Sequence, residues 1–168
     1  MTETAVQQNH SAHTAGTTNE GKYLTFALGA EEFGLEILTV REIIGYISVT
    51  PVPRTPHYIK GVINLRGQVI PVVDLRLKFD MAESEVTDQT CIIVVETVRD
   101  KKEVSVGLVV DRVQEVLYID GQDIDPSPPF GGSVDTDYIL GIAKVGDSVK
   151  ILLNIDKVLQ SEALSEYL

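Results

Sequence analysis

The chain has 168 residues and a formal net charge of −11, from 14 Lys and Arg against 25 Asp and Glu. That charge argues against nucleic acid and anionic membrane as partners, because both require a basic face. The single cysteine excludes an internal disulfide, no apolar run approaches the roughly 20 residues of a membrane span, and the N-terminus does not resemble a signal peptide. Together these features predict a cytoplasmic protein that is not inserted in a membrane.

The first forty residues predict a tail followed by two short strands. Residues 1–20 are polar and predict a disordered tail. Apolar side chains alternate with others over residues 23–28, which is typical of a half-buried strand, and residues 33–37 return after a turn. Residues 38–44 fit either a helical turn or a strand.

The next segment predicts an extended stretch, a hairpin and a short helix. Three prolines keep residues 50–56 extended, because proline fits neither a helix interior nor a central strand. Two apolar runs, 62–65 and 69–73, are joined through Arg66-Gly67, which predicts a hairpin. Asp74 is placed to cap a helix over residues 75–79.

The second half of the chain repeats this plan. Residues 90–96 and 104–110 predict two strands, residues 125–132 form a Pro/Gly loop, and residues 149–154 predict the last strand. A C-terminal helix is expected from Ile155 onward.

The two halves resemble each other in sequence as well as in plan. Gly34 aligns with Gly107 at an offset of 73, and Tyr58 aligns with Tyr138 at an offset of 80. Such a duplication predicts two similar subdomains, here 21–86 and 87–168. Short strands without long helices between them favour small β-barrels. Since half the chain is marginal alone, we expect the two to share a core.

The copies differ most at the first hairpin. The first copy has Lys60, Asn64 and Arg66 where the second has Leu140, Lys144 and Gly146. A solvated turn residue would explain Arg66, but arginine is enriched at the centres of protein interfaces. We therefore favour a partner contact for Arg66. Phe130, framed by prolines, fits an exposed anchor and a ring folded onto its own barrel equally well.

The residues suggest little catalytic or cofactor chemistry. Cys91 lies in an apolar run and predicts a buried, unreactive thiol. The three histidines lack the spacing of a metal site, and no phosphate-binding glycine motif is present, so no metal or cofactor is expected. An acid–base hydrolase that uses Asp74 or Asp111 is the weaker alternative, because both aspartates suit caps and turns.

Longer motifs resemble a known family. Residues 61–67, which read Gly-Val-Ile-Asn-Leu-Arg-Gly, precede Ile-Pro-Val-Val-Asp-Leu at residues 70–75, and Gly-Leu-Val-Val-Asp stands at 107–111. This pattern is similar to that of the CheW-like chemotaxis coupling proteins and of the matching regulatory domain of the CheA histidine kinase. The resemblance extends from Lys22 to the C-terminal helix.

The resemblance implies an all-β fold of two SH3-like five-stranded β-barrels around a shared core, with short helical turns and a C-terminal helix. It implies a non-catalytic adaptor, without cofactor, that is recruited to membrane receptor arrays. There it would couple the cytoplasmic tip of a chemoreceptor to the regulatory domain of a CheA-type histidine kinase. A regulatory binding module for a different kinase or scaffold is the alternative.

The same resemblance assigns two sets of contact residues. The expected chemoreceptor contacts are Val40, Glu42, Lys60, Gly61, Asn64 and Arg66. The expected kinase contacts are Ile124 and Phe130.

Overall fold

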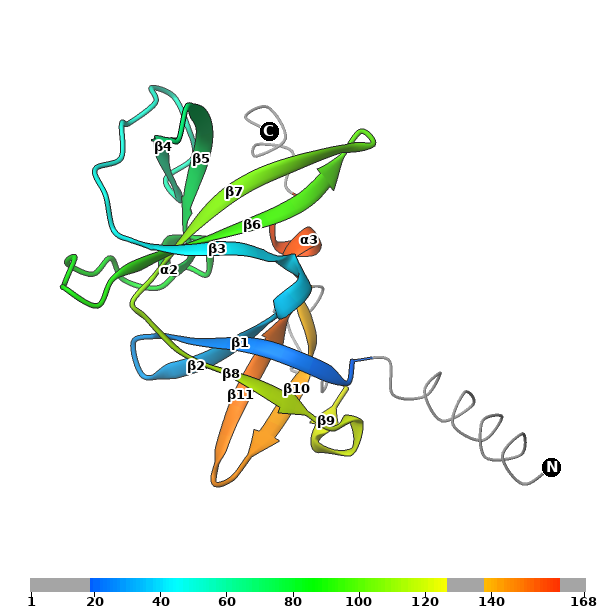
Figure 1. Cartoon of the computed structure of the whole chain (residues 1–168). Coiled ribbons are helices and arrows are strands. Elements are labelled where there is room, and N and C mark those ends of the chain that lie inside the picture. Colours follow the sequence, from blue (N-terminus) through cyan, green and yellow to red (C-terminus); the bar gives the residue numbers. More distant parts are fainter. Residues whose placement is uncertain (1–18, 127–137, 161–168) are drawn as a thin grey trace.

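The computed structural model describes residues 19–126 and 138–160 (Figure 1). Within them the chain forms strands and four single-turn helices. The elements are β1 (Gly21–Leu28), β2 (Glu31–Glu36), η1 (Ile37–Thr39), β3 (Val40–Gly45), β4 (Ile59–Leu65), β5 (Gln68–Asp74), α2 (Leu75–Lys78), β6 (Cys91–Arg99), β7 (Lys102–Val110), β8 (Arg112–Ile119), η2 (Gly121–Asp123), β9 (Ile124–Asp125), β10 (Ile139–Val145), β11 (Ser148–Leu153) and α3 (Ile155–Val158).

The strands form two small barrels, which confirms the predicted fold class. One sheet has five strands in the order β3-β6-β7-β5-β4. The other has the order β8-β1-β2-β11-β10-β9, in which the two-residue β9 is an additional sixth strand. The ambiguous stretch 38–44 is divided, because η1 ends at Thr39 and β3 continues from Val40.

Each repeat lends its first hairpin to the barrel of the other repeat. The β1–β2 hairpin joins the six-stranded sheet, where β2 pairs in parallel with β11 and Gly34 lies opposite Leu152. The β6–β7 hairpin joins the five-stranded sheet, where β7 pairs in parallel with β5 and Gly107 lies opposite Val72. A division at residue 86 therefore separates the two repeats but does not separate the two sheets.

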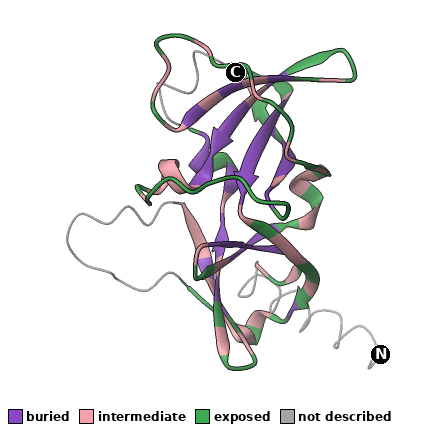
Figure 2. Ribbon diagram, turned by 90° about the vertical axis from the view of Figure 1, so that its left-hand side faces the viewer, coloured by how far each residue is buried: buried purple, intermediate pink, exposed green. Residues whose placement is uncertain are grey.

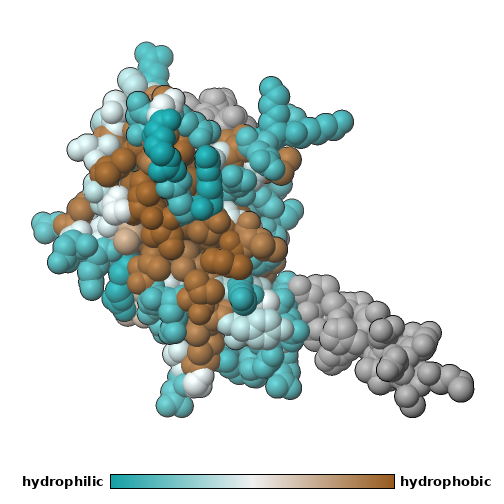
Figure 3. All heavy atoms as spheres, viewed as in Figure 1, coloured by the Kyte–Doolittle hydropathy of each residue, from teal (hydrophilic) through white to brown (hydrophobic). Residues whose placement is uncertain are grey.

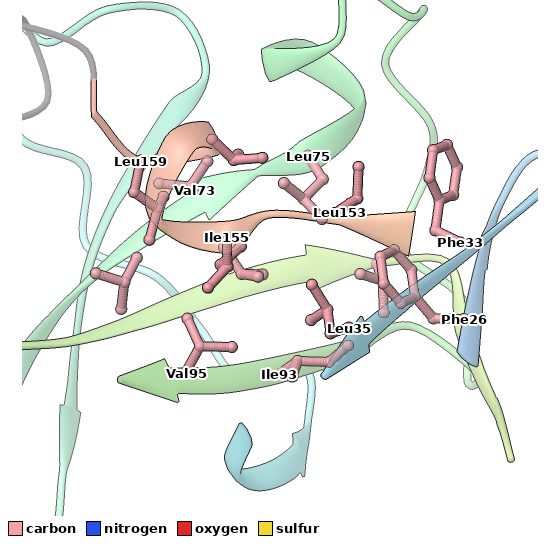
Figure 4. Close-up of a cluster of buried hydrophobic side chains, with 14 of the residues drawn as sticks. Phe26, Phe33, Leu35, Val73, Leu75, Ile93, Val95, Leu153, Ile155 and Leu159 are labelled. Carbon is pink, nitrogen blue, oxygen red and sulfur yellow. The ribbon is translucent and has the colours of Figure 1, made fainter. Parts of the chain in front are cut away.

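A shared hydrophobic core lies between the barrels (Figures 2 and 4). Strand β6 shows how the core is built, because Ile93 and Val95 face it whereas Ile92 and Val94 face the interior of their own barrel. Strand β1 confirms the predicted strand over 23–28, but it is buried on both faces, so the prediction that it is half-buried is wrong. The opposite face of β1 packs inside its own barrel, where Tyr23 lies.

Local signals in the sequence are confirmed at the helix starts and turns. The Asp74 carboxylate accepts hydrogen bonds from the backbone N–H groups of Arg76 and Leu77, as expected for a cap of α2. Asn154 caps α3 in the same way. Asn19 and Glu20 do not belong to the predicted disordered tail, because Asn19 donates to the Leu140 carbonyl and Glu20 accepts from the Gly121 N–H. The rest of that prediction, residues 1–18, lies outside the described residues.

Candidate functional site

The structure divides the predicted receptor contacts between the two ends of the β4–β5 hairpin. Asn64 and Arg66 lie at its tip, and Glu42 on β3 joins them through Arg66. Lys60 and Gly61 lie at the start of β4. Lys60 and Arg66 are six positions apart, which is about 20 Å along an extended chain. The predicted set is therefore extended along the first barrel and does not form a single pocket.

The hairpin tip is held by polar contacts to β3. The Arg66 guanidinium pairs with the Glu42 carboxylate, although β3 and β4 are opposite edges of their sheet. Arg41 donates to the Gln68 side chain at 3.2 Å and to the Ser105 hydroxyl at 2.9 Å. The Arg66–Glu42 and Arg41–Gln68 contacts join β3 to the β4–β5 hairpin across the two edges of the sheet, where backbone pairing ends.

The turn itself has a backbone form that arginine rarely adopts. Arg66 has φ of 51° and Gly67 has φ of 87°, and Asn64 accepts a hydrogen bond from the Gly67 N–H at 2.8 Å. Two positive φ values in succession are typical of a type I′ hairpin turn, in which glycine or asparagine is preferred. The left-handed backbone of Arg66 therefore costs folding free energy at this turn. The Arg66 side chain is 65% exposed.

The base of the hairpin has a structural explanation. Gly61 has φ of 143°, and a Cβ there would lie 1.9 Å from the Thr50 carbonyl oxygen, so only glycine fits beside the extended segment. Gly61 also stands at a register shift between β4 and β5, as Gly141 does between β10 and β11. The Lys60 ammonium lies 3.9 Å from the Asp74 carboxylate and 3.8 Å from that of Glu83.

An apolar face that the sequence reading missed lies on β3 and β8. Val40 on β3 and Val113 on β8 are equivalent in the repeat, and both are half-buried against the shared core. Three residues further on, Ile43 and Val116 are 42% and 48% exposed. Figure 3 shows apolar side chains gathered across the middle of the face seen in Figure 1, at the level where the two sheets meet.

Exposed apolar side chains also flank these strands. They are Leu38 before β3, Ile47 after it and Tyr118 near the end of β8. Large apolar side chains exposed in this number on a protein of net charge −11 are a feature of interaction sites. The offset of 73 that aligns Val40 with Val113 also aligns Ile43 with Val116. This correspondence is the signal in the sequence from which the apolar face could have been predicted.

The two predicted kinase contacts have different outcomes. Ile124 on β9 is half-buried, packs against the interior of the second barrel, and lies where a Cβ on Gly141 would approach it to 2.7 Å. Phe130 lies outside the described residues.

Cys91 is half-buried, whereas the sequence predicted a buried thiol. It begins β6 beside Gly45 of β3, at the border of the shared core, and its thiol donates to the Gln89 carbonyl at 3.2 Å. The end of a strand leaves one side of a residue uncovered, which the apolar run in the sequence did not reveal.

The aspartates that the hydrolase alternative requires have structural partners. Arg76 donates to both Asp111 carboxylate oxygens, at 2.8 and 2.5 Å, and the Gly29 N–H donates to Asp111 at 2.6 Å. The Arg76 hydrogen bonds lower the pKa of Asp111, whereas burial raises the pKa of Asp74. The hollow that both aspartates line holds only about 20 Å³, roughly one water molecule. That space is too small for a substrate.

The described part of the chain contains neither a metal cluster nor a membrane-spanning helix. Within residues 19–126 and 138–160, no three His, Cys, Asp or Glu side chains gather in the way that a metal site requires. No helix in those ranges has the length and apolar character needed to cross a membrane.

Comparisons with known proteins agree on one family. The model of the CheW-like domain matches residues 22–163. A chemotaxis protein CheW of Klebsiella aerogenes is 40% identical over 151 residues, which cover 90% of this chain and 89% of the relative. Protein FrzA of Myxococcus xanthus is 32% identical and covers 84% of this chain, with 87% of its own length matched. The crystal structure of the scaffolding protein TtCheW from Thermoanaerobacter tengcongensis superposes with a TM-score of 0.75 at 36% identity, covering 86% of this chain and 95% of that one.

Proposed function

The chain belongs to the CheW-like family of chemotaxis coupling proteins, and from this premise we propose that it is a non-catalytic adaptor. It joins the cytoplasmic tip of a chemoreceptor to a CheA-type histidine kinase. In this role it works on the cytoplasmic side of the membrane and is recruited there by the receptor array. A scaffold of this kind needs contact surfaces and no substrate cavity.

The observation that carries the proposal is the apolar face on β3 and β8. Its two halves are equivalent in the repeat, and Val40 on β3 and Val113 on β8 both pack against the shared core. A helical receptor tip presents a narrow apolar stripe to its partner, and a shallow apolar face between two barrels is complementary to such a stripe. The face is exposed in the monomer, so docking requires no rearrangement of the fold.

The polar side chains beside this face would orient the bound receptor tip. We place Val40 within the apolar face and Glu42, Asn64 and Arg66 at its polar border. Arg66 offers a permanently charged, planar group on an otherwise acidic protein, which suits an acidic patch on a partner. Lys60 and Gly61, at the far end of the hairpin, belong to the same proposed contact by shaping the base of β4.

The kinase contact is proposed at the other barrel. Ile124 on β9, which is not part of β3 or the β4–β5 hairpin, would form it together with Phe130, which follows β9 in the sequence. Two separate faces are needed because the adaptor must hold receptor and kinase at the same time.

A reconstituted assay with receptor fragment, adaptor and kinase tests the proposal. We expect the double variant Ile43→Ser, Val116→Ser to lose receptor binding and receptor-dependent kinase activation while its melting temperature stays within a few degrees of the original. Val98→Ser is the matched control, because Val98 is equally apolar and 65% exposed on the β6–β7 hairpin. A double variant that couples receptor to kinase normally would refute the assignment of this face.

A further inference from the structure

A second apolar surface, a groove of about 590 Å³, lies beside α2 and the β10–β11 hairpin. Its floor contains Phe33, Phe79, Tyr138 and Ile151. Phe33 stacks on Phe26 of the shared core at 5.6 Å, and Phe79 lies 5.8 Å from Phe33 and 6.1 Å from Tyr138. The floor is therefore a continuous set of packed rings, held in place by the core.

The repeat shows that the fold does not require this groove to be open. By the offset of 80, the lining residues Lys78 and Phe79 correspond to Val158 and Leu159, and both of the latter are completely buried. Ile139 lines the groove and is half-exposed, whereas its equivalent Ile59 is buried. The same architecture thus closes this position in one half of the molecule and leaves it open in the other.

Two exposed carboxylates line the groove, those of Glu31 and Asp80. Among the described residues, no ion pair or side-chain hydrogen bond engages the carboxylates of Glu31 and Asp80, which line it. The Lys78 ammonium lies 4.4 Å from the ring of Tyr58 and 5.6 Å from that of Tyr138, so it is engaged with the aromatic rings. The repeat equivalents of Glu31 and Asp80 are uncharged, since they are Val104 and Gln160.

We propose that this groove docks a short segment of a partner protein that combines a bulky apolar side chain with a nearby arginine or lysine. The apolar side chain would cover the ring floor, and the basic group would pair with Glu31 and Asp80. The groove shares no residue with the proposed receptor or kinase contacts. It therefore adds a third docking surface to the proposed adaptor, with its own charge preference.

Peptide binding to the full chain tests the groove. The probes are a short labelled peptide with a central Leu-Phe followed by Arg-Arg, the same peptide with Glu-Glu in place of Arg-Arg, and one with Ser-Ser in place of Leu-Phe. We expect only the first to bind, with an affinity that falls as salt is raised. Glu31→Lys and Asp80→Lys should each weaken it by about tenfold. Glu103→Lys is the charge-matched control, because Glu103 is exposed on β7 and is not among the residues that line the groove.

Three results would overturn the proposal. The first is equal binding of the three peptides, and the second is unchanged affinity in Glu31→Lys and Asp80→Lys. The third is binding that appears only after residues 1–18 or 161–168 are deleted, because a segment of this chain would then be the occupant. The reconstituted receptor and kinase assay separates this inference from the proposed function, since both lysine variants should still support kinase activation. Loss of activation in them would show that the groove belongs to the adaptor's main contacts.

Discussion

Substitutions of Arg66 can distinguish its effect on the stability of the hairpin turn from its effect on partner binding. The Arg66 side chain is 65% exposed and that of Glu42 is 23% exposed, so loss of this pair near the surface should cost about 0.2–1 kcal/mol of folding free energy. Arg66→Ala keeps a side chain at φ of 51° and should show that small loss. Arg66→Gly removes the left-handed cost, on the order of 1 kcal/mol, and should melt at or slightly above the temperature of the original.

Both variants should lose receptor-coupled kinase activation equally, despite their different stabilities. Truncation of a buried interface arginine costs about 2 kcal/mol or more, roughly thirtyfold in affinity. The assay is thermal unfolding beside receptor titration in the reconstituted complex, with Arg66→Lys as a control that keeps the charge but not the planar fork. Normal kinase activation by both variants would show that Arg66 is a solvated turn residue without a role in partner binding. A large drop in the melting temperature of both would make it structural.

Four other predictions follow from the structure. Deleting residues 1–18 should leave the melting temperature and kinase binding unchanged, whereas a deletion that includes Asn19 and Glu20 should lower the melting temperature measurably. Calorimetry should show one unfolding transition for both barrels, and two resolved transitions would contradict the shared core. Phe130→Ser should weaken kinase binding in a pull-down with little change in stability, and a loss of about 3–5 kcal/mol would instead mean that the ring is buried. Asp111→Asn should cost about 2–3 kcal/mol at neutral pH, measured by denaturant unfolding. Arg76 holds the pKa of Asp111 below its usual range, so the stabilisation by this pair is complete above about pH 4 and is lost as the pH falls through the lowered pKa. The free energy of unfolding of Asp111→Asn should therefore depend less on pH in the acid range than that of the original protein.

Local chemistry made much of the fold predictable. The Asp74 cap and the Arg66-Gly67 turn depend on a few neighbouring residues, and both are present as expected. The exchange of hairpins was not predictable from the same patterns. Strands β2 and β11 pair although more than a hundred residues separate them, and parallel pairing over that distance has no local signature.

The candidate site was only half predictable for a related reason. Charge and the difference between the repeats drew attention to Arg66, whose side chain is exposed at a tip. Ile43 and Val116 are apolar residues in apolar strands, so their sequence context is the same as that of core residues. Their exposure arises because β3 and β8 are edge strands, and edge position is decided by the order of strands in each sheet.

The exchange of hairpins between the barrels also affects how the protein folds during its synthesis on the ribosome. The five-stranded barrel uses only β3 to β7, so it can close soon after Val110 emerges. The β1–β2 hairpin emerges first, yet its partner β11 is among the last strands translated, a delay on the order of 10 s. Throughout that interval β1 has two apolar faces without their final cover. We therefore expect nascent chains to be prone to aggregate through β1 until β11 has been translated, and a chaperone that binds nascent chains to protect this strand.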